Sequence, residues 1–225
     1  MSGGTLYIVS TPIGNLADLS ARAAEILGSV DVVACEDTRR TGRLLAGLGL
    51  KKKLVSVHEH NEASRVGPLL ELLGRGQSIA LVSDAGTPLV SDPGYRLVRS
   101  SLAEGYRVSA LPGPSAVLTA LVGSGLPPYP FTFLGFPPAK SGKRRSFFAR
   151  YAELDHTLVF FESPHRLIHS LEQALEVMGD RPAAVSRELT KLHEESFRGP
   201  LGELLEELRS RDRLRGEFVV VVGGA

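Results

Sequence analysis

The fold class of this chain of 225 residues is most evident in one segment, Ser78-Ile79-Ala80-Leu81-Val82-Ser83-Asp84-Ala85-Gly86-Thr87-Pro88. Its first half is a short apolar run without polar alternation, which is typical of a strand buried on both faces of a parallel sheet. Its second half is polar and rich in turn residues, and a helical segment follows it. A buried strand followed by a polar turn and a helix is the repeating unit of α/β proteins.

The same unit recurs along the whole chain. The sequence predicts strands at 6–9, 30–34, 54–57, 78–82, 107–110, 131–134, 157–161, 183–187 and 218–222. Helices are predicted at 19–27, 41–48, 62–73, 92–103, 143–151, 164–178 and 201–209, and a further helix opens near 113–116. Asp92 is expected to cap the fourth of these helices, with Pro93 at its first position. The alternation predicts an α/β fold with a mostly parallel sheet.

Proline-rich connections divide the chain near its middle. A Pro-Gly-Pro segment lies at 112–114, and further proline-rich stretches follow at 126–130 and 136–139. We therefore expect two α/β domains, residues 1–112 and 113–225, with a cleft between them.

Composition narrows the class of protein. Lys and Arg together number 26, and Asp and Glu together number 25, so the chain is nearly neutral. A near-zero net charge does not indicate a nucleic-acid-binding protein, but a local basic patch is still possible. The single cysteine permits no internal disulfide and no cysteine-based zinc site within one chain, and it is typical of a reducing compartment. No apolar run approaches the ~20 residues that span a membrane, and no secretory signal is evident. We expect a cytoplasmic protein. The pair His58 and His60 is a weak metal pattern, and no metal is expected.

Four predicted strands end in loops rich in Gly, Pro and polar residues, at 11–15, 36–39, 83–88 and 112–116. Ligands of open α/β sheets bind at the carboxyl ends of the strands, and glycine allows them to approach the backbone closely. The known phosphate-binding fingerprints are absent. No Gly-x-Gly-x-x-Gly follows the first strand, and the P-loop-like segment 135–143 has too many residues between its glycines.

Six segments in order carry a resemblance: Thr11–Leu16, Cys35–Arg39, Ser83–Pro88, Ser91–Gly94, Leu111–Ala116 and Phe161–Arg166. Together they resemble the bacterial 16S ribosomal RNA cytidine 2′-O-methyltransferases of the tetrapyrrole-methylase superfamily, over essentially the whole chain. The resemblance implies an S-adenosylmethionine-dependent enzyme of two α/β domains, with the cofactor in the cleft between them. It also implies a homodimer and 16S ribosomal RNA of the small subunit as the substrate.

The resemblance implies cofactor contacts at Ile13, Asp84, Gly86, Thr87, Val90, Ser115, Ala116, Phe161 and Leu189. S-adenosylmethionine carries no phosphate, so the absence of a phosphate-binding loop agrees with this expectation. The cofactor needs backbone donors and acceptors for its amino-acid end and its adenine, together with apolar walls.

Because a ribose hydroxyl is a poor nucleophile, we predict a catalytic base among Glu36, Asp37 and His165, with Asp84 and Glu162 as further candidates. Histidine has an ordinary pKa near 6.5, whereas a carboxylate needs a raised pKa to serve as a base. The alternatives are that Glu36 and Asp37 cap the following helix and that His165 is an ordinary surface residue.

Contacts to RNA phosphates are predicted at Arg39, Arg166, Lys140, Lys143, Arg144 and Arg145. Phe147 and Phe148 lie beside the last four and could stack on bases, although helix positions of this kind are more typical of core. Arg166 could instead pair with Glu162.

Two other functions stay open from the sequence. One is a methyltransferase for a small, tetrapyrrole-type substrate, and the other is a non-catalytic RNA-binding or ribosome-assembly module. Segments 36–39 and 162–166 favour RNA, because they characterise the ribosomal subfamily. Longer members of that family continue past the last predicted strand. If that extension helps to hold ribosomal RNA, the affinity of this chain for RNA comes from other segments or is weaker.

Overall fold

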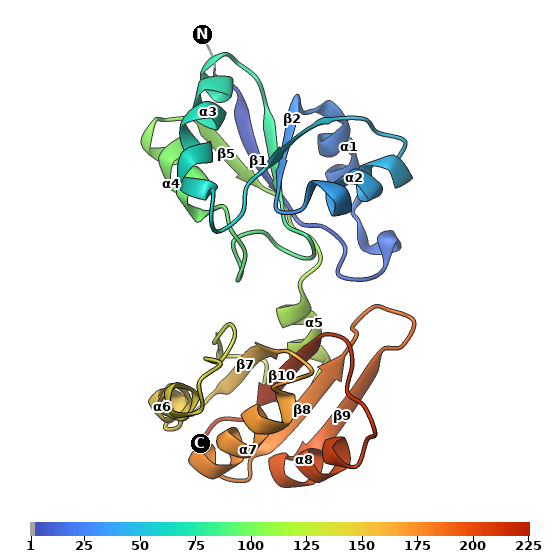
Figure 1. Ribbon diagram of the computed structural model, residues 1–225, viewed down its shortest axis with the longest axis vertical. Helices are drawn as coiled ribbons and strands as arrows, with labels where there is room; N and C mark the ends of the chain where they lie inside the picture. Colours follow the sequence, from blue (N-terminus) through green and yellow to red (C-terminus); the bar gives the residue numbers. More distant parts are fainter. Residues whose placement is uncertain (1–2) are drawn as a thin grey trace. The chain divides into compact units, whose positions relative to one another are not determined.

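The computed structural model describes residues 3–225, and the chain forms two compact units, Met1–Ser115 and Ala116–Ala225 (Figure 1). Each unit contains one five-stranded sheet with helices packed on it. The predicted α/β class is therefore confirmed. The division falls after Ser115, whereas the sequence placed the boundary after residue 112.

The sheet of the first unit is entirely parallel, with the strand order β3-β2-β4-β1-β5. Its strands are β1 (Thr5–Val9), β2 (Val32–Cys35), β3 (Lys53–Ser56), β4 (Ile79–Val82) and β5 (Arg107–Ala110). Its helices are η1 (Leu16–Asp18), α1 (Ala21–Ser29), α2 (Thr38–Gly47), α3 (Glu62–Gly74) and α4 (Tyr95–Ala103).

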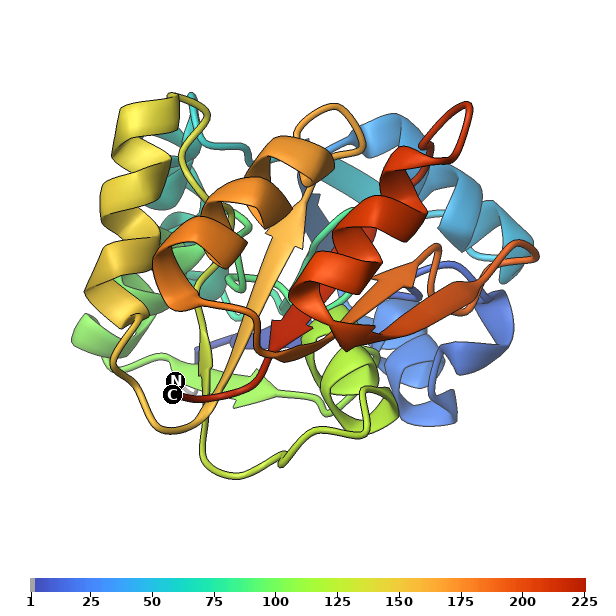
Figure 2. The same cartoon turned by 90° about the horizontal axis from the view of Figure 1, so that it is seen from below.

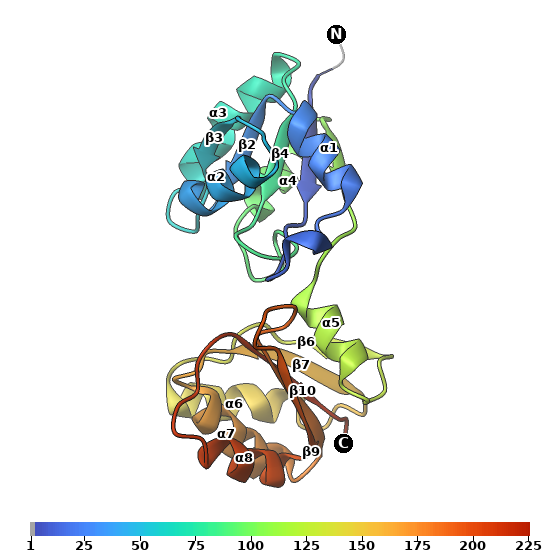
Figure 3. The same cartoon turned by 90° about the vertical axis from the view of Figure 1, so that its right-hand side faces the viewer.

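Alternate residues of the central strands face two separate cores in this unit. Ile79 and Leu81 pack with Leu69, Leu73 and Leu97 from α3 and α4. Their neighbours on β4, Ala80 and Val82, face α1 and α2 on the opposite side. Figures 1 and 3 show the two pairs of helices on the two faces. Burial on both faces explains why these strands are continuous apolar runs.

The sheet of the second unit is mixed, with the order β6-β7-β10-β8-β9. Its strands are β6 (Phe131–Phe133), β7 (Thr157–Glu162), β8 (Pro182–Arg187), β9 (Glu195–Pro200) and β10 (Phe218–Val222). Its helices are α5 (Ala116–Gly123), α6 (Ser141–Tyr151), α7 (Leu167–Met178) and α8 (Leu201–Arg209). Helices α6, α7 and α8 lie side by side across one face (Figure 2), and their core includes Phe148, Phe160 and Leu171.

The prediction of a mostly parallel sheet is wrong for this unit. Only β6 and β7 pair in parallel, whereas β10 runs antiparallel to both of its neighbours and β9 antiparallel to β8. The sequence missed β9 because this edge strand buries only Phe197 and otherwise reads as polar. The hairpin partner of β8 therefore carried no apolar run to reveal it.

The start of α4 also differs from the prediction. The helix begins at Tyr95 with Gly94 as its N-cap, and Asp92 and Pro93 lie in the preceding loop. The buried Glu62 carboxylate of α3 accepts hydrogen bonds from the backbone N–H groups of Gly94 (3.2 Å) and Arg96 (2.7 Å). A side chain from another helix thus satisfies the free N–H groups that Asp92 was expected to cap.

None of the helices within residues 3–225 combines the length and the apolar character needed to cross a membrane.

Candidate active site

The loops that follow β1 and β4 are joined by backbone hydrogen bonds at the carboxyl edge of the first sheet. Thr11 and Gly86 exchange N–H···O bonds of 2.9 and 3.0 Å, which makes a short antiparallel bridge. The Thr11 hydroxyl donates to the Ser83 carbonyl at 3.1 Å. These contacts hold the two polar loops in one arrangement.

Gly86 is required at the point where these loops meet. Its φ of +83° is a backbone conformation that disfavours residues with a Cβ. A Cβ there would lie 3.3 Å from Cγ2 of Ile13, closer than ordinary contact. The predicted cofactor residues Ile13 and Gly86 therefore contact each other across the loops.

The loop after β5 is tied to the same edge. The Ser10 hydroxyl donates to the Thr87 hydroxyl at 3.2 Å, and Thr87 donates to the Pro114 carbonyl at 3.1 Å. A Cβ on Gly113 would lie 2.7 Å from Cβ of Ser10, so this close approach also depends on glycine. Three loops from distant parts of the sequence thus form one hydrogen-bonded platform.

The segment that follows this platform is strained. Leu89 and Ser91 have φ of 72° and 67°, which is unusual for residues other than glycine. Val90, a predicted cofactor residue, lies between them and is 39% exposed. Strain of this kind persists where the surrounding structure holds it, and it clusters at functional sites.

Asp37 and Asp84 occupy a corner of the platform at the start of α2. The Asp37 N–H donates to Oδ1 of Asp84 at 3.0 Å, and Arg40 lies 3.4 Å from the other Asp84 oxygen. The Asp37 side chain accepts the backbone N–H of Arg39 at 2.7 Å, which is an N-cap contact. This hydrogen bond lowers the pKa of Asp37. Asp37 is therefore a helix cap and a weak base, as the alternative interpretation proposed.

Glu36 has the properties of a base that Asp37 lacks. Its carboxyl is partly buried, and burial, followed by the nearby Asp84 charge, raises its pKa. Asp92 lies close enough to interact with it, and burial together with the charge of Glu36 raises the pKa of Asp92 to about 6. Asp92 was predicted only as a helix cap, although its raised pKa and its proximity to Glu36 make it a candidate for the site. Its position in the Ser91–Gly94 motif was the available signal.

In the second unit, Glu162 and Arg166 form an internal ion pair. The Glu162 carboxylate is fully buried and lies 2.9 Å from the Arg166 guanidinium. It also accepts hydrogen bonds from the Ser163 N–H and the Ser170 hydroxyl. Arg166 further donates to the Ser163 hydroxyl. This arrangement supports the alternative of an internal pair for Arg166 over the predicted phosphate contact.

The other predicted residues at the ends of β7 and β8 lie in different settings. Phe161 packs its ring against Phe133 and Phe136, with centroids 4.9 and 5.3 Å away. His165 is exposed. Leu189 is buried in a turn where Glu188 has φ 52° and Thr190 has φ 65°. Phe161, Leu189 and Ala116 belong to the second unit, and their contact with a cofactor stays a prediction, as does the role of His165 as a base.

The predicted RNA-binding residues on α6 separate into two groups. Arg144 is buried, and its Nε donates to Oε1 of Gln173 at 2.7 Å, so the prediction of a phosphate contact there is wrong. The helix repeat turns Arg144 inward together with Phe148, which is fully buried. Lys140, Lys143 and Arg145 are exposed, although Arg145 pairs with Glu176 at 2.7 Å.

Within residues 3–225, no group of three or more His, Cys, Asp or Glu side chains is arranged to hold a metal ion. The rings of His58 and His60 lie 6.0 Å apart.

Comparison with known proteins gives the class of this protein. The chain belongs to the tetrapyrrole (corrin/porphyrin) methylases, whose sequence profile matches residues 5–205. Among curated relatives, ribosomal RNA small subunit methyltransferase I of Micromonospora olivasterospora is 51% identical over 222 residues, covering 99% of this chain and 71% of that protein. The protein of the same name from Escherichia coli O157:H7 is 50% identical over 225 residues, covering 99% and 79%. This chain is therefore an enzyme, a methyltransferase.

Solved structures support the fold. Uroporphyrin-III-C-methyltransferase from Thermus thermophilus matches with a TM-score of 0.67 at 23% identity, covering 98% of this chain and 94% of that chain. Diphthine synthase matches with a TM-score of 0.71 at 17% identity, covering 98% and 90%. At these identities the likeness establishes the fold alone.

Tetrapyrrole methylases and ribosomal RNA methyltransferases use S-adenosylmethionine as methyl donor. The platform of the first unit fits such a ligand. Ile13 provides an apolar side chain at the point where the loops meet, beside the backbone of Gly86. The carboxylates of Asp84 and Glu36 suit a ligand that carries a positive charge.

Proposed function

We propose that this enzyme transfers a methyl group from S-adenosylmethionine to the 2′-hydroxyl of a cytidine ribose in 16S ribosomal RNA of the small subunit. One observation carries the proposal. About half of the residues of this chain are identical to those of relatives named ribosomal RNA small subunit methyltransferase I, in alignments that cover 97–100% of this chain. We thus propose for this chain the ribosomal RNA substrate that the names of those relatives give.

The cofactor residues of the first unit are Ile13, Asp84, Gly86, Thr87, Val90 and Ser115, and those of the second unit are Ala116, Phe161 and Leu189. When bound, S-adenosylmethionine supplies a methyl group on a sulfonium, which is already a good leaving group. The larger task of the protein is then to position the two reactants. The cross-linked loops support this role, because their backbone groups are already held in place before any ligand binds.

Glu36 is our proposed base for the ribose hydroxyl. Its raised pKa makes it a better proton acceptor than an ordinary carboxylate. Asp37 holds the start of α2 and thereby fixes the backbone next to Glu36. His165 is the second candidate, because it is an exposed histidine, and histidine is the residue type that most often transfers protons near neutral pH.

Contacts to RNA phosphates are assigned to the exposed side chains among the predicted set. Arg39 at the start of α2 has a side chain that is 89% exposed, and Lys140, Lys143 and Arg145 lie on the outer side of α6. Arg166 is assigned instead to holding Glu162 and the end of β7.

We also propose a homodimer in the cytoplasm. The apolar side chains Leu118, Val122 and Tyr129 of the second unit are 52%, 75% and 89% exposed, and a subunit interface would cover such a surface. Sedimentation at several protein concentrations tests the dimer.

The proposed cytoplasmic location follows from the proposed ribosomal substrate.

The small-molecule alternative rests on the family name alone, and the likeness to uroporphyrin-III-C-methyltransferase is at the level of fold. The ribosomal relatives are about twice as similar in sequence. A non-catalytic module has no observation in its favour.

The decisive experiment is transfer of labelled methyl groups from S-adenosylmethionine to small ribosomal subunits that lack this modification, followed by nuclease mapping. We expect one ribose-methylated cytidine. Label on a base, or transfer to a tetrapyrrole but not to the subunits, would overturn the proposal. A calorimetric titration of S-adenosylmethionine controls for an inactive preparation.

A further inference from the structure

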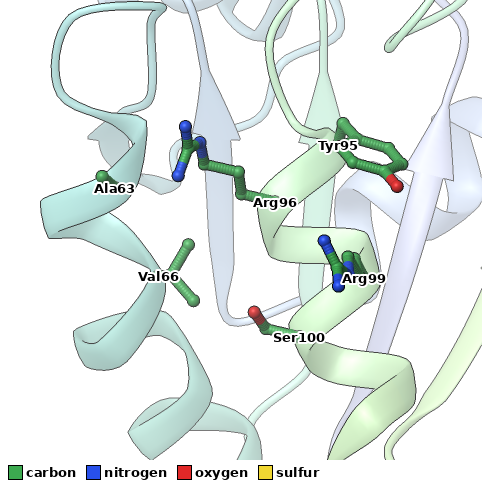
Figure 4. A pocket seen from close by; sticks show the side chains of 6 residues that line it. All are labelled: Ala63, Val66, Tyr95, Arg96, Arg99 and Ser100. Atoms are coloured by element: carbon green, nitrogen blue, oxygen red, sulfur yellow. The ribbon is translucent and has the colours of Figure 1, made fainter.

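A pocket of about 430 Å³ opens on the first unit between α3 and α4. Its lining comes from two helices: Ala63 and Val66 of α3, and Tyr95, Arg96, Arg99 and Ser100 of α4. Figure 4 shows Ala63 and Val66 of α3 on the side of the pocket opposite Arg96 and Ser100 of α4, whereas the ring of Tyr95 lies on the side of α4 away from α3. None of these residues belongs to the platform described above.

The helical repeat explains the composition of the pocket. Arg96, Arg99 and Ser100 are spaced three and four residues apart, so they share one face of α4. Ala63 and Val66 share the facing side of α3 and are too short to fill the space between the helices. The same turn of α4 turns Leu97 into the core, where it is fully buried.

The pocket is positively charged and has no internal counter-charge. Within residues 3–225, Arg96 and Arg99 make no ion pair and their side chains no hydrogen bond. No carboxylate is among the lining residues that the structure describes. The adjacent Glu62 carboxylate is buried and already accepts the N–H groups of Gly94 and Arg96. Two unpaired guanidinium groups beside one cavity favour a bound anion, and phosphate is the anion that arginine recognises best.

Tyr95 adds a second kind of contact. Its side chain stands at the first position of α4 and is 62% exposed, so its ring is free to stack. Proteins that bind single-stranded RNA combine aromatic rings, which stack on bases, with basic side chains, which contact phosphates. The two arginines and the tyrosine together favour RNA over a free phosphate ion, because a phosphate ion has no base on which the ring could stack.

The chain connectivity links this pocket to the platform. Tyr95 lies three residues after Asp92, at the end of the loop that also carries Asp84, Gly86 and Thr87. An RNA strand held at α4 would therefore lie next to the loop that we assign to the cofactor.

We propose that this pocket is a subsite for the phosphate backbone of the RNA substrate, with Arg96 and Arg99 contacting phosphates and Tyr95 stacking on an adjacent base. The inference rests on the proposed function and names a segment of the enzyme that holds its substrate. It is distinct from the predicted patch on α6.

The test is the double variant Arg96→Glu/Arg99→Glu, compared with Arg75→Glu/Arg107→Glu. The control reverses the same amount of charge at the other end of α3 and at the start of β5. Both variants are measured for KM and kcat on unmodified small subunits, for equilibrium binding of the same subunits at several salt concentrations, and for S-adenosylmethionine affinity.

In the pocket variant we expect KM to rise about tenfold or more, with kcat within about twofold of the unaltered enzyme. The slope of log K for subunit binding against log salt concentration should become less steep by about 1.4 to 2. The affinity for S-adenosylmethionine should not change. Tyr95→Ala should weaken binding without changing that slope, because stacking involves no counterion.

A pocket variant that matches the control in KM and in salt slope would overturn the inference. If the unaltered enzyme binds subunits but methylates no ribose, the proposed function fails, while the binding comparison still decides the role of the pocket. Should the charge reversals prevent folding, Arg96→Ala/Arg99→Ala makes the same comparison, because both side chains are exposed.

Discussion

The two sheets of this enzyme hold their loops by different forces. In the first unit, backbone and hydroxyl hydrogen bonds such as Thr11 to Gly86 and Thr87 to Pro114 join neutral groups. In the second unit, the loops after β7 and β8 are held by charged pairs, Glu162 with Arg166 and Glu188 with Lys191. The first arrangement depends on close packing of glycines, and the second depends on compensated charge.

The difference follows from topology. All strands of the first sheet are parallel, so the ends of β1, β4 and β5 meet at one edge and their backbones approach closely. In the second sheet the antiparallel β10 lies between β7 and β8, so no strand ends between them at the edge where their loops begin. The charged pairs Glu162 with Arg166 and Glu188 with Lys191 therefore act within each loop.

The largest expected effect is on stability in the second unit. Glu162→Ala should lower the free energy of unfolding by about 3–5 kcal/mol, because it leaves Arg166 uncompensated beside buried partners. Glu176→Ala removes the partner of the exposed Arg145 and should cost less than about 1 kcal/mol. Urea unfolding of both variants measures the difference. Equal losses would mean that the buried pair contributes no more than a surface pair.

The next effect is on turnover in the first unit. Glu36→Gln should lower kcat by about a hundredfold, because the base is lost while the shape of the side chain is kept. Asp37→Ala should instead lower the free energy of unfolding and leave turnover less affected, because it removes the cap of α2. Methyl-transfer kinetics and thermal unfolding separate the two roles. Near-normal turnover in Glu36→Gln would transfer the role of base to His165, for which His165→Ala is the matching test.

A smaller effect is expected on cofactor affinity. Gly86→Ala should weaken S-adenosylmethionine binding about tenfold, because the added Cβ strains a left-handed backbone and presses on Ile13. Gly105→Ala is the matched control, since Gly105 also has a positive φ, of 76°, but its added Cβ would meet open space. Calorimetry should find lost affinity only in Gly86→Ala. Equal affinities would exclude the platform as the cofactor site.

The smallest effect concerns pH. Burial, followed by the charge of Glu36, raises the pKa of Asp92 from its ordinary 3.8 to about 6 in the folded enzyme. The folded state therefore holds a proton that the unfolded state releases, so this group makes stability fall as pH rises from about 4 to about 6. Asp92→Asn should remove that part of the slope in urea unfolding.

The converse substitution tests the coupling between the two carboxyls. Glu36→Gln should lower the pKa of Asp92, because the charge of Glu36 no longer opposes ionisation of Asp92. An NMR titration of the Asp92 carboxyl measures this change, and an unmoved pKa would show that the two groups titrate independently.

Much of the first unit could be predicted from local sequence. A continuous apolar run such as 78–82 is typical of a strand that is buried on both faces, so the strands could be predicted. Gly and Pro are typical of turns, so the loops that follow the strands could be predicted as well. The same reasoning failed for β9, whose edge position requires only Phe197 to be apolar. It also failed for Arg144, whose inward direction depends on the phase of α6 against the core.

The α/β class, the polar loops at the strand ends and the family resemblance could be read from the sequence, because each rests on residues that are close together along the chain. The folded structure was needed to show which carboxyl has a raised pKa, which arginine is buried and which residue caps α4. Glu62 caps that helix from 32 residues away in the sequence, and Glu36, which is also distant from Asp92 in the sequence, lies near enough to raise its pKa. Electrostatics and burial depend on distance in space, and distance along the chain does not reveal it.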